Sequence, residues 1–247
     1  MKLLVCISKT PDTTAKIAFT DNNSRFDTNG VTFIMNPTDE WYALVRAIEI
    51  KEQLGGSVTV INVGPKDNET VVIHKALAIG ADDAVRIDAD PADAFFVASQ
   101  IAAYAKDQNY DLIFTGKETI DYNGSNIGGM VAELLDLPYV SLANHLEMAG
   151  NTATVTREIE GGQEVIEVNT PFVISAQKGM AEQRIPNMRG IMTARSKPLK
   201  VVPPVPVTAY TTIAYYELPP QRKEVKLIDP EHPEELVKLL HEQAKVI

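Results

Sequence analysis

The sequence has little cysteine and no long hydrophobic run. Its single cysteine, Cys6, excludes an internal disulfide and any metal or iron–sulfur centre built from clustered cysteines, and it fits a reducing compartment. The apolar run Leu3–Ile7 near the start of the chain is too short for a secretion signal or a membrane span. We therefore expect no targeting segment and no membrane insertion. The location would be cytoplasmic in a bacterium, or the mitochondrial matrix in a eukaryote.

Positive charge is also scarce. The chain has 23 Lys and Arg against 33 Asp and Glu, a formal net charge of -10, which disfavours a nucleic-acid-binding surface. The basic residues that stand out fall in one short stretch: Arg184, Arg189, Arg195, Lys197 and Lys200.

Catalytic and metal-binding patterns are missing as well. The sequence has no HExxH motif and no nucleophile elbow. Its four histidines are His74, His145, His232 and His241, and none is close in sequence to a nucleophile pair. The acidic stretch at 82–93 lacks the spacing of a calcium-binding loop. We expect no catalytic residues and no metal site.

Strand-like and helix-like segments alternate through roughly the first 140 residues, a rhythm typical of a parallel sheet with crossover helices. We expect strands at Leu3–Ser8, Ser57–Val63, Ala84–Ile87 and Tyr110–Thr115. Helices are expected at Thr38–Leu54, Asn68–Ile79, Pro91–Asp107 and Ser125–Leu135. Because such crossovers are almost always right-handed, the prediction is a doubly wound α/β fold with helices on both faces of the sheet.

The pattern becomes β-rich after Pro138. Strands are expected at Tyr139–Leu142, Ala153–Glu158, Glu164–Val168 and Phe172–Ala176, with a hairpin turn at Gly161-Gly162. From Pro198 onward, frequent prolines predict an extended arm that cannot join a central sheet. A last helix is expected from about Asp229, with an apolar stripe that needs a covering surface: Leu236, Leu239, Leu240 and Ala244.

A glycine-containing loop at 116–129 is the first candidate for ligand binding. It follows a strand and opens a helix, which is where open α/β sheets bind ligands and where free backbone amides favour a phosphate. Lys117 follows the first glycine, so the loop is neither a P-loop nor a GxGxxG dinucleotide motif. The alternative is an ordinary loop in which Asp121 or Ser125 caps the helix.

A second loop, Met35–Asp39, precedes the first long helix. Asn36 either hydrogen-bonds a base or ribose, or belongs to the Asn-Pro chemistry common before helices. Both loops are expected along one sheet edge, together with the strand ends at Cys6 and Val63. Four converging strand ends predict a mononucleotide pocket.

Another surface is predicted by a charged hairpin at 156–164 and a basic, apolar-studded segment at 183–199. We expect this surface to contact another protein. The organisation we predict is a nucleotide-binding α/β domain with the hairpin at 1–182, a recognition loop at 183–200, and an arm with a terminal helix at 201–247.

These segments and several others closely resemble β subunits of electron transfer flavoproteins. The matching motifs are Arg157–Glu164, Arg184–Asn187, Ile191–Leu199, Leu4–Ile7, Pro11-Asp12, Met35–Pro37, Val63–Pro65, Ala76–Asp82 and Gly116–Asp121. The likeness extends over essentially the whole chain. It implies an adenine-nucleotide-hydrolase-like fold.

The resemblance implies an electron carrier of two subunits, α and β. Such a carrier takes electrons from flavin-dependent dehydrogenases, such as the acyl-CoA dehydrogenases of fatty acid β-oxidation, and passes them to a downstream quinone oxidoreductase. The α subunit holds most of the FAD, and the β subunit binds a structural AMP. The positions that match the nucleotide site are Cys6, Asn36, Pro37, Thr38, Asp39, Val63, Gly116, Lys117, Asp121, Asn123, Gly124, Ser125, Asn126 and Ile127.

The family's partner contacts also have counterparts in this chain. Glu158 matches a glutamate that pairs with an arginine of the α subunit, and Met188 falls at the apolar anchor of the recognition loop. The positions that match partner contacts are Glu158, Arg184, Met188, Arg189, Ile191, Met192 and Arg195. The arm and last helix would pack on the α subunit.

The chain departs from the family pattern at three places. Ile127 stands where a hydroxyl is expected, and Ser125 is a substitute source of one. The loop also differs from that of bifurcating members, which hold a second FAD in this pocket, so AMP and a second FAD both remain candidates. The anchor is methionine where leucine is more usual, a change that a flexible thioether tolerates. A different class that also fits the α/β layer is a universal-stress-like nucleotide sensor.

Overall fold

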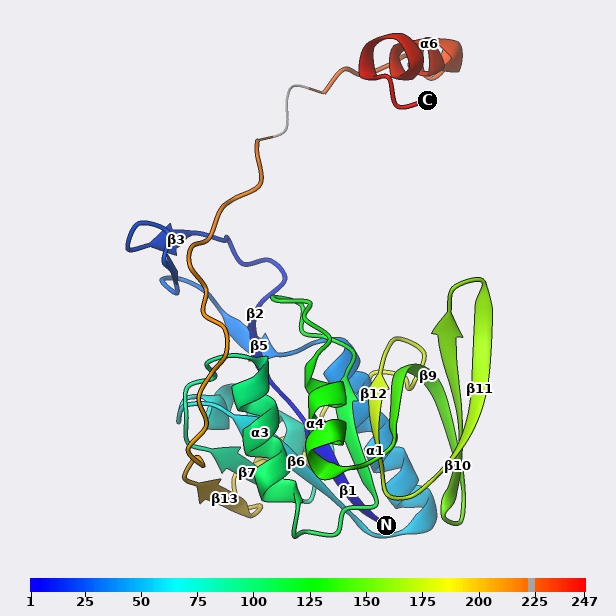
Figure 1. Cartoon of the computed structure of the whole chain (residues 1–247). Helices are drawn as coiled ribbons and strands as arrows, with labels where there is room; N and C mark the ends of the chain where they lie inside the picture. Colours follow the sequence, from blue (N-terminus) through cyan, green and yellow to red (C-terminus); the bar gives the residue numbers. More distant parts are fainter. Residues whose placement is uncertain (222–224) are drawn as a thin grey trace.

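A nine-stranded sheet forms the centre of the molecule in the computed structural model, which describes residues 1–221 and 225–247 (Figure 1). Its strand order is β11-β10-β9-β12-β8-β1-β6-β7-β13. The strands are β1 Lys2–Cys6, β6 Ser57–Val63, β7 Asp83–Ile87, β8 Leu112–Gly116, β9 Tyr139–Ala149, β10 Thr152–Ile159, β11 Gly162–Asn169, β12 Phe172–Ala176 and β13 Leu199–Val202. β1 lies parallel to β6 on one side and to β8 on the other.

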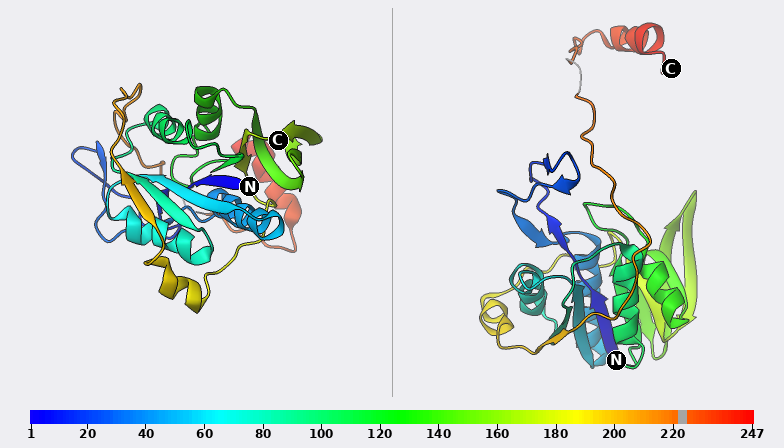
Figure 2. Two further views of the ribbon diagram at one scale, coloured as in Figure 1. Left: turned by 90° about the horizontal axis from the view of Figure 1, so that it is seen from below. Right: turned by 60° about the vertical axis from the view of Figure 1, so that its left-hand side comes forward.

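Helices cover both faces of the sheet, as predicted (Figure 2). One face packs against α1 Asp39–Leu54, the π-helical turn η1 Glu69–Ile73, α2 His74–Ile79 and α5 Met188–Ala194. The other face packs against α3 Ala94–Ala105 and α4 Ile127–Leu135. Successive residues of β1 alternate between the two cores, since side chains along a strand point to opposite faces.

The predicted helices end where glycine was expected to end them. α1 stops before Gly55, with φ 76°, and α2 stops before Gly80, with φ 151°, backbone conformations that favour glycine. The single helix expected at Asn68–Ile79 is divided into η1 and α2. π-helical turns of this kind are frequent at functional sites.

Two short strand pairs were not predicted. β2 Lys9–Pro11 pairs with β5 Phe33–Met35, and β3 Phe19–Thr20 pairs with β4 Arg25–Phe26, both antiparallel and outside the main sheet (Figure 1). The strand expected at Tyr139–Leu142 is also longer, because β9 continues to Ala149 and pairs with β10 along its outer half. That half carries polar residues, so its apolar pattern is weak.

The expected arm begins later than predicted. Leu199–Val202 is not arm but edge strand β13, which lies parallel to β7. Proline cannot donate a hydrogen bond to a neighbouring strand, but Pro203 and Pro204 come after the paired residues, so they do not disturb this edge strand. Beyond them the arm follows α3, where the Gln100 amide bonds both the N–H and the carbonyl of Val205 at 2.8 and 2.9 Å.

A terminal helix is present, as predicted. It consists of α6 Pro233–Leu239 and the π-helical turn η2 Leu240–Ala244, and it stands away from the sheet at the end of the arm (Figure 1). No residue of either element is buried, so the apolar stripe is left without a cover by the described part of the chain. No helix in residues 1–221 and 225–247 is long and apolar enough to cross a membrane.

Candidate functional site

The carboxyl ends of β6, β1 and β8 form the edge at which the nucleotide pocket was predicted. The chain leaves β1 toward β6 on one side and reaches β8 on the other, which makes β1 a topological switch point. In open α/β sheets, ligands bind in the crevice outside such a point. Cys6, Val63 and Gly116 end these three strands.

Glu40 is a buried acid at this edge that the sequence analysis did not single out. Its carboxylate accepts hydrogen bonds from the Ser8 amide at 2.7 Å and from the Ser8 hydroxyl at 2.7 and 2.9 Å. A Cβ on Gly116 would lie 2.8 Å from Cγ of Glu40, so only glycine fits at the end of β8. Burial raises the pKa of Glu40 to about 8, with a further contribution from the nearby Asp121 and Asp39 carboxylates.

Asn36 joins the two predicted ligand loops. Its buried side chain donates from Nδ2 to the Glu118 carbonyl at 3.0 Å and accepts at Oδ1 from the Ile120 amide at 3.4 Å. Both polar ends of the amide are thus used within the chain. Pro37, Thr38 and Asp39 follow it into the start of α1, where burial raises the pKa of Asp39.

The loop between β8 and α4 is organised around Glu118. This carboxylate pairs with Lys117 at 2.9 Å and accepts a hydrogen bond from the Ser125 hydroxyl at 3.3 Å. Asn123 donates its amide to the Thr119 carbonyl at 3.0 Å. Gly124 has open space beside it, since a Cβ added there would have only the Asn126 side chain within 4 Å.

The start of α4 has no side-chain cap among the described residues. The N-cap residue is Asn126, which makes no side-chain cap bond, while Asp121 accepts from the Tyr122 amide and Ser125 bonds Glu118. The alternative role of Asp121 or Ser125 as a helix cap is therefore wrong. The first-turn amides at Ile127 and beyond have no helical acceptors, and such amides suit an anionic ligand.

Cys6 and Val63 form part of the wall beneath this edge. Both are buried in the core that contains α3 and α4. Burial raises the pKa of the Cys6 thiol, and the charge of Glu40 adds to the effect. A neutral, buried thiol is a packing group, because the thiolate is the reactive form. In the described residues, no group of three or more His, Cys, Asp or Glu side chains is placed to hold a metal ion.

The arm crosses close to the nucleotide loop, which sequence analysis missed. The Tyr122 and Tyr216 hydroxyls are 3.1 Å apart, and the Tyr216 ring stacks on Phe19 with a centroid distance of 4.8 Å. The Tyr216 amide also donates to the Asn23 carbonyl at 2.7 Å. No sequence signal could have revealed this junction, because its members are separated by up to 197 positions, from 19 to 216.

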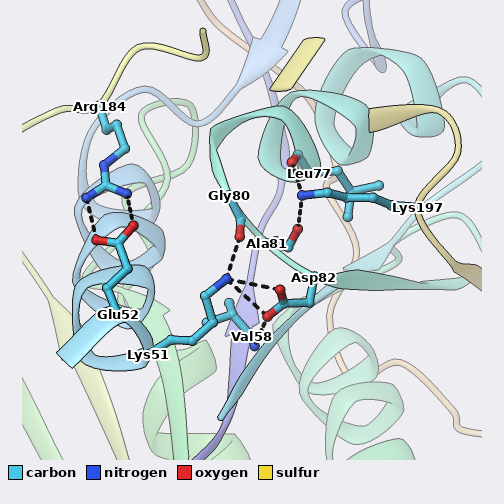
Figure 3. Close-up of polar contacts among 9 residues, drawn as sticks. All are labelled: Lys51, Glu52, Val58, Leu77, Gly80, Ala81, Asp82, Arg184 and Lys197. Atoms are coloured by element: carbon cyan, nitrogen blue, oxygen red, sulfur yellow. Dashed lines mark hydrogen bonds and ion pairs between the residues drawn. The ribbon is translucent and has the colours of Figure 1, made fainter. Parts of the chain in front are cut away.

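The segment at 183–200, predicted to recognise a partner, is fixed to the domain at both ends (Figure 3). Arg184 makes a two-pronged ion pair with Glu52, at 2.7 and 3.0 Å. Lys197 donates to the Leu77 and Ala81 carbonyls at 2.8 and 2.5 Å, at the end of α2. Arg184 is thus paired within the chain and is not free for a partner. The segment between Arg184 and Lys197 contains α5.

α5 packs on α2 and presents apolar residues outward. Asn187 caps it by accepting from the Gly190 amide at 2.8 Å, and Ala194 is buried in the core. Met188, Ile191 and Met192 are 74%, 52% and 77% exposed. Such a cluster of exposed apolar side chains is typical of a protein contact.

Glu158 lies apart from α5. It belongs to β10 in the hairpin at the other end of the sheet from β13, and it accepts a weak hydrogen bond from Asn144 at 3.4 Å. The predicted partner residues therefore form two separate surfaces. Arg189 and Arg195 are both exposed and belong with α5.

The family model and the most similar curated proteins all point to one protein family. A family model described as an electron transfer flavoprotein domain matches residues 24–207. Electron transfer flavoprotein subunit beta of Bacillus subtilis is 36% identical, with 100% of both chains covered. The human subunit beta is 32% identical over 90% of each chain. The acryloyl-CoA reductase electron transfer subunit gamma of Anaerotignum propionicum is 32% identical over 82% of this chain and 77% of its own.

We predict that Glu40→Gln removes a pH dependence of stability. Glu40 in the unfolded chain loses its proton near 4.5, whereas the folded chain keeps it to about 8, so the wild-type free energy of unfolding falls as pH rises between these values. The loss is on the order of a few kcal/mol, at about 1.4 kcal/mol per pKa unit. Denaturation midpoints at pH 5 to 9 measure it. Glu133→Gln, on the exposed side of α4, is the control, and parallel curves for wild type and Glu40→Gln would contradict the prediction.

We also predict that Gly190→Ala loosens α5. The added Cβ would lie 2.2 Å from the Ala78 carbonyl oxygen, so α5 must move away from α2, at a cost of about 1 to 3 kcal/mol. Hydrogen exchange of the α5 amides should become faster. Gly162→Ala is the matched control, since its Cβ meets nothing within 4 Å. Alanine ordinarily stabilises a helix relative to glycine. Slower exchange in α5 would therefore contradict the prediction, because it would show that the contact with the Ala78 carbonyl does not destabilise α5.

Proposed function

This chain belongs to the family of electron transfer flavoprotein β subunits, and on that basis we propose that it pairs with an α subunit to carry electrons from flavin-dependent dehydrogenases. In this proposal it helps hold the FAD of the α subunit, binds a structural nucleotide at the β1 edge and docks the dehydrogenase through α5. A quinone oxidoreductase downstream is the acceptor. The observation that carries the proposal is α5, which holds apolar residues outward on a segment anchored at both ends.

AMP is the nucleotide we propose for the β1 edge. The uncapped start of α4 supplies amides for a phosphate, and the phosphate's negative charge is favoured at a helix N-terminus. Gly116 lets the loop approach closely, and Gly124 leaves room beside it. Ser125 is the nearby hydroxyl that compensates for the apolar Ile127.

A second FAD in the same pocket is the alternative. The subunit gamma that resembles this chain serves, by its name, as the electron transfer subunit of an acryloyl-CoA reductase. An apolar residue at the start of α4, Ile127, is compatible with either ligand. This alternative would make the complex a bifurcating one that also oxidises NADH.

The α subunit contact is proposed for the arm, the terminal helix and Glu158. α6 and η2 have no buried residue, so their apolar stripe is available to pack on another chain. Residues 222–224, within the arm, lie outside the described part of the chain. In this proposal Glu158, which is exposed on the hairpin, meets a cation of the α subunit.

Purification with the α subunit tests the proposal. We expect a heterodimer with the visible absorbance of oxidised flavin, and one AMP for each FAD. Two FAD per heterodimer with no AMP would establish the bifurcating alternative. A nucleotide-loaded homodimer without flavin absorbance would contradict the proposal and favour a stand-alone nucleotide sensor of the universal-stress type.

We predict that Met188→Ala slows electron delivery without loss of flavin. Truncating an apolar anchor at a transient interface typically costs on the order of 2 kcal/mol, which is a rate loss of about thirtyfold below saturation. Reduction of the heterodimer by an acyl-CoA dehydrogenase measures the rate, and the flavin spectrum measures the content. Ile17→Ala, at another exposed apolar residue, is the control. Parallel loss of bound FAD would assign Met188 a folding role instead.

A further inference from the structure

A groove of about 330 Å³ lies between the η1–α2 helices and the segment that carries α5. Its apolar walls include Val71, Ala78 and Ile191. Three nitrogen-bearing side chains, His74, Lys75 and Arg195, also line it. The sequence analysis assigned a partner role to Ile191 and Arg195 but none to the η1–α2 side of the groove. The groove begins at the π-helical turn η1, an irregularity of the kind that is frequent at functional sites.

The groove is a built feature of the fold, because its two sides are fixed to each other. The contact of Gly190 with the Ala78 carbonyl sets the spacing of α5 and α2. The ion pair of Arg184 with Glu52 and the bonds of Lys197 to the end of α2 fix the segment on either side (Figure 3). The walls therefore need little rearrangement to receive a ligand, which lowers the entropic cost of binding.

The charges of the groove suit an anion. Arg195 has no carboxylate partner in residues 1–221 and 225–247. The Lys75 ammonium lies 4.5 Å from the centre of the Trp41 ring, which holds its position, and burial lowers its pKa although Asp12 opposes the effect. Nδ1 of His74 is buried and has no hydrogen-bond partner among the described residues. On a chain with a net charge of -10, the residues that line the groove in the described part of the chain include Lys75 and Arg195 and no acidic residue.

The apolar surface continues beyond the groove. Ile191 belongs both to the groove and to the exposed cluster that includes Met188 and Met192. An apolar centre with methionine, bordered by arginine and other polar side chains, is typical of a protein interface. A small molecule would fill the groove and leave the cluster exposed, whereas a protein segment covers both.

We propose that the groove is a socket that receives an apolar side chain flanked by a carboxylate on the partner dehydrogenase. The apolar side chain enters between Val71, Ala78 and Ile191, and the carboxylate pairs with Lys75 and Arg195. Docking then has two elements, an anchor that projects from α5 and a socket beside it. This inference rests on the proposed function, since it assumes that α5 meets a dehydrogenase.

The test uses the flavin-loaded heterodimer and an acyl-CoA dehydrogenase that reduces the wild type. Lys75→Gln combined with Arg195→Gln should raise the KM for the heterodimer about tenfold, because two interfacial ion pairs are lost. It should also weaken the salt dependence of KM, and leave kcat and flavin content unchanged. Thr70→Phe, at an exposed groove residue, should raise KM by filling the socket.

Two controls separate the socket from general charge effects. Lys200→Gln removes one positive charge at β13, where Lys200 lies over the Tyr104 ring at 5.5 Å, and should leave KM unchanged. Lys75→Arg, in a chain that keeps Arg195, should leave KM close to the wild-type value because it preserves the charge and the cation–π contact with Trp41.

The outcomes distinguish the socket from the function on which it rests. If the groove variants keep the wild-type KM while Met188→Ala slows transfer, the socket is wrong and the docking role of α5 stands. If decanoate raises the melting temperature of the wild type but not of the double variant, the groove is a small-molecule site and the socket is wrong. If no dehydrogenase reduces the wild-type heterodimer, the proposed function fails and the socket fails with it.

Discussion

The parallel pairing of β1 with β6 on one side and β8 on the other is the constraint on which the rest of the structure depends. It buries β1 between two helical layers and directs the chain to opposite sides of that strand. The ends of the three strands consequently lie at one edge, where Ser8, Glu40 and Gly116 meet. In open α/β sheets ligands bind outside such a switch point, which is why we propose this edge for the nucleotide.

At that edge, a buried carboxylate lowers the stability of the fold but holds the neighbouring loops in place. Glu40 is buried and its pKa is raised to about 8, so keeping it there lowers the stability of the fold at neutral pH. In return, the Ser8 amide and hydroxyl fix its carboxylate, and Gly116 allows the β8–α4 loop to pass beside it. Asn36 then ties the same loop to the start of α1. The side chains at the edge proposed for the nucleotide are thus held in place at the expense of stability, as at functional sites in general.

The surface at α5, which we propose for docking, is built in a different way. Its framework is polar and intrachain, through Arg184 with Glu52 and Lys197 with the carbonyls of α2. Its exposed part is apolar and is bordered by Lys75 and Arg195. Fixing the backbone while leaving the side chains available reduces the entropy lost on docking, which suits the transient contact that we propose for this surface.

The sequence by itself determined the secondary structure wherever the residues of one short segment were enough to predict it. β6 was predicted at its observed bounds, and Gly55 and Gly80 ended α1 and α2 as expected, because hydrophobic period and glycine conformation are local properties. The sequence also predicted that the strand ends at Cys6 and Val63 and the loop after β8 share one edge, and they do, because the ends of parallel strands converge.

Only the tertiary structure decided which side chains meet. The Ser8–Glu40 bonds, the Arg184–Glu52 pair, the Tyr122–Tyr216 junction and the parallel pairing of β13 join residues that are 32 to 132 positions apart. No local pattern encodes such contacts, because they follow from how helices pack on both faces of the sheet and from where the chain returns to it.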